Sequence, residues 1–137
     1  MNYLLDTNVC IALINGTSSQ VRRRYFQATR HQIIPHTSSI VAHELWYGVA
    51  KSGHPEKNAK RVGTFFAGPV VVLPFEDGDA RAAGKVRATL EAAGKPIGAY
   101  DVLIAGQALR HKLTLVTSNA REFGRVTGLL WEDWGRE

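Results

Sequence analysis

Three carboxylates stand in apolar stretches of the sequence, where an ionised side chain is costly. Asp6 follows a short apolar run, and Glu44 and Asp101 lie inside longer ones. A carboxylate that loses its hydration requires a cation or hydrogen bonds in place of the water. Converging oxygen ligands without cysteine or histidine suit a hard cation such as Mg²⁺ or Mn²⁺. The three acids are therefore the first candidates for chemistry.

Each acid also has an ordinary structural explanation. Asp6 could cap the helix that follows it, and the dipole of its helix could favour Asp101. Glu44 could be solvated on an exposed helix. Each acid alone is weak support for a site. Their joint placement, one at a strand end and two flanked by apolar helix, is more specific.

Short strands and helices alternate along the chain and must position these acids. Thr7 or Asn8 is expected to cap the first helix, and Ser38 or Ser39 the third. Such alternation predicts a mainly parallel sheet with helices on both faces, in one domain over residues 1–137. The expected strands are 3–5, 32–35, 70–73, 113–117 and an edge strand at 129–131, and the expected helices are 7–14, 21–29, 39–51, 55–66, 76–93 and 100–111.

This arrangement predicts that the acids meet at one edge of the sheet. The carboxyl ends of parallel strands converge with the N-termini of the helices that follow them. Asp6 ends a strand, and Asp101 begins a helix that precedes the strand at 113–117. That strand leads to Asn119, which we expect at the same edge. A divalent cation would relieve the repulsion between carboxylates crowded there.

Composition narrows the classes of function. The 137 residues include 17 Lys and Arg against 12 Asp and Glu, a net charge of +5, which favours a polyanionic partner such as nucleic acid. The single cysteine, Cys10, excludes an internal disulfide framework and a cysteine-rich metal site, and fits a reducing cytoplasm. We expect neither a membrane span nor an export signal.

Several catalytic motifs are absent or incomplete. The pair His43 and Glu44 lacks the second histidine of a zinc protease helix, and no Walker or dinucleotide glycine pattern occurs. The segment 6–9, which begins with Asp6, partly matches the first motif of haloacid-dehalogenase-like phosphatases. That motif needs a second aspartate where this chain has Asn8. A phosphatase remains a minor alternative.

Four segments carry a resemblance to a known family: residues 4–8, 39–48, 96–105 and 115–123. In this order they resemble the PIN-domain ribonucleases, and in particular the VapC toxins of bacterial toxin–antitoxin pairs. The resemblance extends from Asn2 to about Trp134. It implies a three-layer α/β/α sandwich and Mg²⁺- or Mn²⁺-dependent cleavage of structured RNA, such as tRNA, that inhibits translation. It also implies a cytoplasmic homodimer, or a higher toxin–antitoxin complex, neutralised by a VapB-type antitoxin.

The resemblance also implies roles for single residues. Asp6, Glu44 and Asp101 match the three acidic positions of the family, with Asp6 and Asp101 as metal ligands. Asn119 stands where many members have a fourth acid, which favours one metal over two, and Glu122 is near enough to compensate. Two small hydroxyl positions that support the acids match Thr7 and Thr117.

The resulting hypothesis is a water attack on a phosphodiester, with Glu44 as outer-shell orienter or general base. A rival is a PIN-like module that binds RNA or protein without catalysis, with Asn119 as the mark of a lost site. Residues 129–134 could finish the sheet or form a dimer surface, and the sequence does not separate these two.

Overall fold

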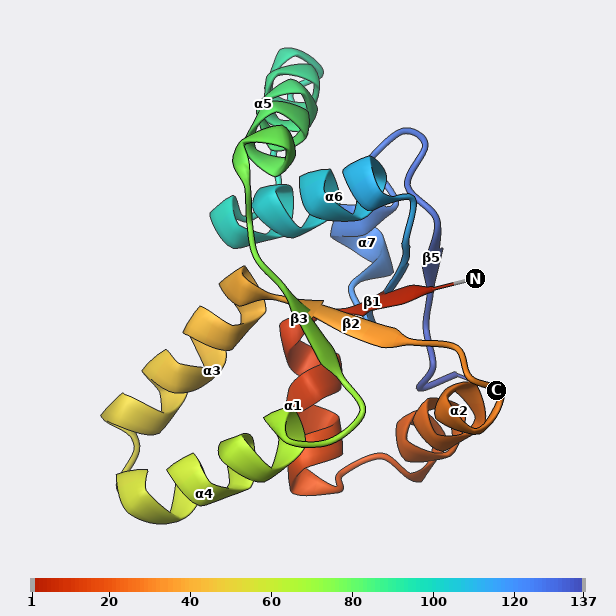
Figure 1. Ribbon diagram of the computed structural model, residues 1–137. Helices are drawn as coiled ribbons and strands as arrows, with labels where there is room; N and C mark the ends of the chain where they lie inside the picture. The colour runs from red at the N-terminus through yellow and green to blue at the C-terminus, as the bar shows by residue number, and fades with distance from the viewer. Residues whose placement is uncertain (1, 137) are drawn as a thin grey trace.

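The computed structural model describes residues 2–136 and has a five-stranded sheet at its centre (Figure 1). All neighbouring strands pair in parallel, in the order β3-β2-β1-β4-β5. The strands are β1 (Tyr3–Leu5), β2 (Pro35–Ser38), β3 (Val71–Leu73), β4 (Thr114–Val116) and β5 (Trp131–Glu132).

Helices cover both faces of this sheet. Figure 1 shows α1 to α4 on one face and α5 to α7 on the other, which confirms the expected three-layer α/β/α sandwich. Within residues 2–136, no helix has the length and apolar character needed to cross a bilayer. The helices are α1 (Thr7–Asn15), α2 (Ser19–Arg30), α3 (Ser39–Lys51), α4 (Pro55–Phe66), α5 (Asp77–Ala92), α6 (Ala99–His111) and α7 (Ala120–Phe123).

The central strands explain where the first acid lies. Leu5 of β1 pairs with Val116 of β4, and both side chains are fully buried, as expected for strands covered on both faces. The next residue on each strand is Asp6 and Thr117. These two residues therefore lie side by side at the carboxyl edge, where the Asp6 N–H donates to the Val116 carbonyl at 3.1 Å.

The second strand was predicted at 32–35, and this placement is wrong. Helix α2 continues to Arg30, and the chain then turns through Gln32, which has a positive φ of 60°. Pro35 is the first residue of β2 that pairs with β1, and Ile34 is 46% exposed. The apolar residues before Pro35 belong to the connection, so an apolar pair was mistaken for the strand.

The tail of the chain completes the sheet. The predicted edge strand is present as β5, although it begins at Trp131 rather than at residue 129. Trp134 is buried and packs edge-to-face against Tyr3, with ring centroids 5.0 Å apart. The short helix α7, which no pattern predicted, lies between β4 and this tail.

Candidate active site at the carboxyl edge of the sheet

Asp6 joins the first strand to the first helix. Its side chain caps α1 by accepting the Val9 N–H at 2.9 Å, so the prediction of Thr7 or Asn8 as the cap is wrong. Burial is the main cause that raises the pKa of Asp6, and the Glu44 carboxylate adds to it. A hydrogen bond with the Thr117 side chain opposes that rise. Asp6 is therefore both a helix cap and a buried acid.

Glu44 is brought to Asp6 by helix α3. This helix begins after Ser38, whose hydroxyl accepts the Ile40 N–H at 3.0 Å, as one of the two predicted caps. The Glu44 side chain is half-buried one turn further on, and its Oε1 accepts the Thr7 hydroxyl at 2.8 Å. The hydroxyl thus fixes the position of one carboxylate oxygen.

Asp101 lies in the first turn of α6 and has other acids around it. The pKa of Asp101 is raised to about 7, first by burial and then by Glu122. The charges of Asp6 and Glu44 raise it further. Each additional negative charge makes the ionised form of Asp101 less favourable. The shift therefore reports a concentration of negative charge at this edge.

Glu122 connects Asp101 to the end of β4. Its Oε1 accepts the Gly98 N–H at 2.8 Å, and its Oε2 accepts the Asn119 amide at 2.7 Å. These hydrogen bonds, together with one to Asp101, lower the pKa of Glu122. Asn119 in turn donates its backbone N–H to the Thr117 hydroxyl at 2.9 Å. An ionised carboxylate thus stands beside the Asn119 amide.

The structure brings every predicted site residue into one connected group at the carboxyl edge of the sheet, where β1 and β4 end and α1, α6 and α7 begin. Hydrogen bonds and carboxylate repulsion link its members, so none of them lies elsewhere in the fold. The group, called the edge cluster below, comprises Asp6, Thr7, Glu44, Asp101, Thr117, Asn119 and Glu122.

Another buried acid shows what is missing from the edge cluster. Asp79 is fully buried on α5, and its Oδ1 pairs with Arg110 at 3.1 Å and with His111 at 3.3 Å. Among residues 2–136, no comparable ion pair involves the carboxylates of the edge cluster. The fold pairs one buried acid with Arg110 and His111 and leaves the carboxylates of the edge cluster without a comparable ion pair in the described part of the chain.

This charge imbalance fits a bound cation. In the described part of the chain, no three His, Cys, Asp or Glu side chains converge closely enough to hold an ion by themselves. Mg²⁺ needs no such group, because it keeps several waters and uses one or two protein carboxylates. Asp6 and Asp101, which interact electrostatically across the edge, are suited to that role.

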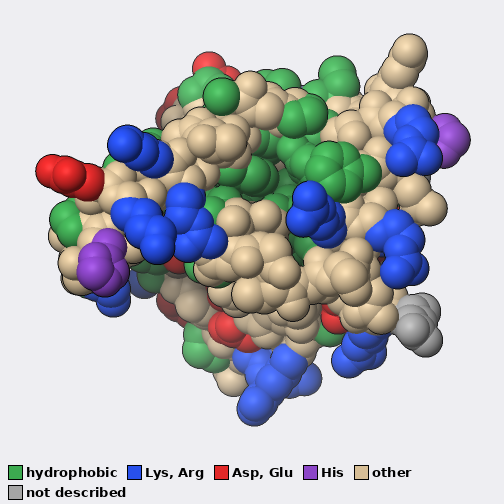
Figure 2. All heavy atoms as spheres, turned by 90° about the horizontal axis from the view of Figure 1, so that it is seen from below, with side chains coloured by type: hydrophobic (Ala, Val, Ile, Leu, Met, Phe, Trp, Pro, Cys, Tyr) green, Lys and Arg blue, Asp and Glu red, His purple; other side chains and the backbone are tan. Residues whose placement is uncertain are grey.

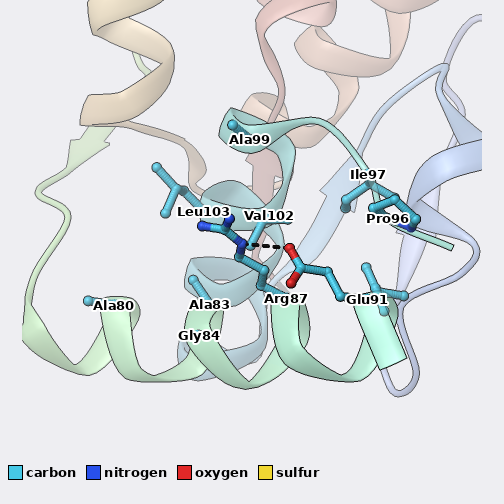
Figure 3. A pocket seen from close by; sticks show the side chains of 11 residues that line it. Ala80, Ala83, Gly84, Arg87, Glu91, Pro96, Ile97, Ala99, Val102 and Leu103 are labelled. Atoms are coloured by element: carbon cyan, nitrogen blue, oxygen red, sulfur yellow. Dashed lines mark hydrogen bonds and ion pairs between the residues drawn. The ribbon is translucent and has the colours of Figure 1, made fainter. Parts of the chain in front are cut away.

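A separate hollow between α5 and α6 lacks such chemistry. Figure 3 shows its mostly small apolar lining, with Arg87 and Glu91 as its charged side chains. These two charges pair with each other at 2.9 Å on the exposed surface. Since the pair satisfies itself, the hollow offers no unpaired acid or base for catalysis.

Sequence reasoning missed one contact of the edge cluster and one buried acid outside it. The Gly98 N–H donates a hydrogen bond to Glu122. This contact depends on how the residues before α6 pack against α7, and no residue type in the sequence indicates it. Burial of Asp79 was also missed, because neighbouring charges at Glu76 and Asp77 made that segment look solvated. The spacing of Glu76 and Asp79 did carry a capping-box pattern, which the structure contains.

Known proteins are similar to this chain over nearly its whole length. The PIN domain profile matches residues 3–129. The tRNA(fMet)-specific endonuclease VapC of Shigella flexneri is 39% identical over 134 residues, which span 98% of each chain. The protein of the same description from Salmonella typhimurium is 40% identical, again over 98% of each chain.

Solved structures of similar proteins have the same fold. The crystal structure of VapBC2 from Rickettsia felis, bound to a promoter DNA fragment, contains a chain with a TM-score of 0.92 and 34% identity. The match covers 98% of this chain and 99% of that one. DNA-bound VapBC from Salmonella typhimurium gives a TM-score of 0.90 at 39% identity, over 98% of each chain. The chain belongs to the PIN-domain family and, within it, to the VapC ribonucleases.

Proposed function

We propose that this protein is a metal-dependent endoribonuclease that acts as the toxin of a toxin–antitoxin pair. The observation that carries the proposal is the edge cluster, where four carboxylates gather and, among residues 2–136, none of them forms an ion pair. Such a cluster repels phosphate by itself, and a divalent cation turns it into a phosphate-binding site. The family and its relatives supply the choice of RNA as substrate.

Asp6 and Asp101 are the proposed ligands of Mg²⁺ or Mn²⁺. The bound cation would neutralise charge on the phosphate and activate water for attack on phosphorus. Glu44, fixed by the Thr7 hydroxyl, would orient that water or accept its proton. Glu122 would orient Asp101, since the Gly98 N–H and the Asn119 amide hold it in place.

The proposed substrate is a structured RNA with an unpaired loop. Two relatives that are 39% and 40% identical are described as tRNA(fMet)-specific endonucleases, so tRNA(fMet) is the first RNA to test. Proteins reach the bases of RNA mostly in loops and bulges, because the major groove of an RNA duplex is too narrow. The net charge of +5 supports binding to the phosphate backbone.

We propose that a VapB-type antitoxin binds an apolar surface that begins beside Glu44. One hollow lies between α1, α3 and α4 and includes Ile11, Leu45 and Glu44 itself. A second hollow adjoins it at Ile14, and Figure 2 shows hydrophobic side chains there, surrounded by Lys and Arg. An amphipathic segment with its apolar face in these hollows would end next to the carboxylates, where a basic side chain would neutralise them.

The test is cleavage of a tRNA(fMet) transcript by the purified protein with Mg²⁺, with Mn²⁺, or with a chelator. We expect a few discrete cuts that require the metal and that disappear in Asp101→Asn. The matched control is Asp77→Asn, because Asp77 also lies in the first turn of a helix but pairs with Arg81 on the surface.

The outcomes distinguish the proposal from a binding module. Undiminished metal-dependent cleavage by Asp101→Asn contradicts the assignment of the site. Cleavage that survives the chelator contradicts the metal dependence. Binding of the RNA without cleavage, together with no uptake of Mn²⁺ by calorimetry, favours a non-catalytic PIN-like module. The homodimer implied by the family resemblance stays a prediction, which light scattering of the purified protein checks.

A further inference from the structure

Two exposed rings lie beside the carboxylates of the edge cluster. Tyr100 directly precedes Asp101 on α6, and His43 directly precedes Glu44 on α3. Their ring centroids are 5.7 Å apart, and the planes are tilted by 55°. Helices α3 and α6 therefore bring the rings of His43 and Tyr100 together. One residue further along each helix, they bring together the carboxylates of Glu44 and Asp101, which interact electrostatically.

The rings are placed beside the carboxylates rather than among them. Successive residues of a helix point about 100° apart, so Tyr100 faces a different direction from Asp101. Tyr100 is 47% exposed, which leaves much of its ring open to solvent. A large exposed aromatic side chain is ordinary by itself. Its position next to a proposed phosphate-cleaving site gives it a specific use.

We propose that Tyr100 is a stacking platform for an unstacked RNA base next to the cleaved phosphate, and that His43 positions its ring. The inference rests on the proposed ribonuclease function. Unstacked bases of RNA loops commonly stack on aromatic side chains, and such stacking tolerates different bases. A base held there would fix the adjoining phosphate at the edge cluster.

The geometry indicates which face of the ring is used. A base can fit between two rings only if the rings are parallel and roughly 7 Å apart, which is twice the distance between stacked bases. The observed 5.7 Å and the 55° tilt leave too little room for such a sandwich. The base therefore stacks on the side of Tyr100 away from His43. This arrangement makes His43 a positioning residue, which holds the ring without touching the base.

The experiment uses a stem–loop RNA with 2-aminopurine at one loop position at a time. The protein is Asp6→Asn with Mg²⁺, so that the RNA stays intact. We expect quenching of the fluorescence at one position, loss of that quenching in Tyr100→Ala and Tyr100→Leu, and its retention in Tyr100→Phe. His43→Ala should weaken the quenching, and His43→Phe should restore it. Equal quenching with Tyr100→Ala, or full retention with Tyr100→Leu, overturns the proposal.

Kinetics give a second, independent measurement. In the otherwise unchanged protein, Tyr100→Ala should lower kcat/KM by about 5- to 100-fold, which corresponds to the loss of one base stack. An abasic nucleotide at the quenched position should slow the wild-type protein but not Tyr100→Ala. The matched control is Phe26→Ala, because Phe26 is similarly exposed, at 45%, on the distant helix α2.

The two proposals fail separately. Absence of cleavage by the wild-type protein contradicts the proposed function, whereas the fluorescence measurement still decides whether Tyr100 stacks on a base. Cleavage by wild type and Tyr100→Ala at equal kcat/KM retains the ribonuclease and contradicts the stacking platform.

Discussion

Asp79 and Asp101 are both acids in the first turn of a helix, but their surroundings differ. Arg110 and His111 pair with Asp79. Asp101 instead interacts with other carboxylates, and its pKa is raised to about 7. Position in a helix therefore does not determine the electrostatic surroundings of an acid. The neighbouring side chains do, and only Asp79 has an arginine as its partner.

This difference predicts a pH dependence for the metal-free protein. The folded state keeps a proton on Asp101 up to about pH 7, whereas the unfolded chain releases it near its ordinary pKa of 3.8. The contribution of Asp101 to the free energy of unfolding therefore falls as pH rises from about 4 to 7. In thermal unfolding, Asp101→Asn should become progressively more stable than wild type across that range.

Addition of Mg²⁺ provides the control for this measurement. A cation that binds ionised Asp101 should stabilise the wild-type protein near pH 7 and leave Asp101→Asn largely unaffected. Comparison of the two proteins removes contributions that they share, such as that of His36, whose pKa is lowered by burial. Parallel pH curves for the two proteins would contradict the charge assignment.

The Thr7 hydroxyl allows a test of Glu44 without removal of a carboxylate. Thr7→Val deletes the 2.8 Å hydrogen bond to Glu44 with little change in shape. A hydrogen bond to a charged group is worth ~1.5–3 kcal/mol, so we expect kcat for RNA cleavage to fall about tenfold or more. Metal affinity should stay the same. Thr7→Ser, which keeps the hydroxyl, should retain the activity, and equal losses in both variants would argue against this role.

At the scale of elements, α5 and α6 pack so closely that a glycine is required between them. A Cβ on Gly106 would lie 2.5 Å from the backbone nitrogen of Ala83, whereas one on Gly84 would meet nothing within 4 Å. This contact fixes α6, which carries Asp101 and Tyr100. The position of Asp101 therefore depends on backbone packing at Gly106, about one and a half turns further along α6.

Two alanine substitutions test this packing. Gly106→Ala should lower the free energy of unfolding by about 1–3 kcal/mol, because the helices must separate to admit the methyl group. Gly84→Ala on the partner helix should instead raise it by about 0.5–1 kcal/mol, since alanine favours a helix over glycine. Denaturant unfolding measures both. Similar effects of the two substitutions would show that the close contact is not limiting.

The elements also show how far sequence reasoning extends. The acids at 6 and 101 were identified because a carboxylate interrupts an apolar run, and parallel topology placed them at one edge. The start of β2 was misplaced, because Ile33 and Ile34 look like a strand while the turn at Gln32 is a property of the folded backbone. Glu122 could be named only as a neighbour, since its link to Gly98 exists only in the folded chain.

At the scale of the whole molecule, the net charge of +5 is an average over unlike regions. Lys and Arg are spread over the face shown in Figure 2, while the edge cluster gathers carboxylates that form no ion pair within residues 2–136. The exterior attracts a polyanion, and the site itself repels phosphate until a cation is bound. This division explains how a basic protein can have an acidic candidate active site.

The central claim, that the edge cluster cuts RNA, is tested most directly by mapping new RNA 5′ ends after a brief pulse of expression in bacterial cells. Asp6→Asn suits this test because asparagine caps a helix as well as aspartate does, so the fold is retained while the carboxylate is lost. We predict discrete new ends in a small set of RNAs with wild type and with Asp77→Asn, and none with Asp6→Asn. The same ends at the same abundance with Asp6→Asn would contradict the account.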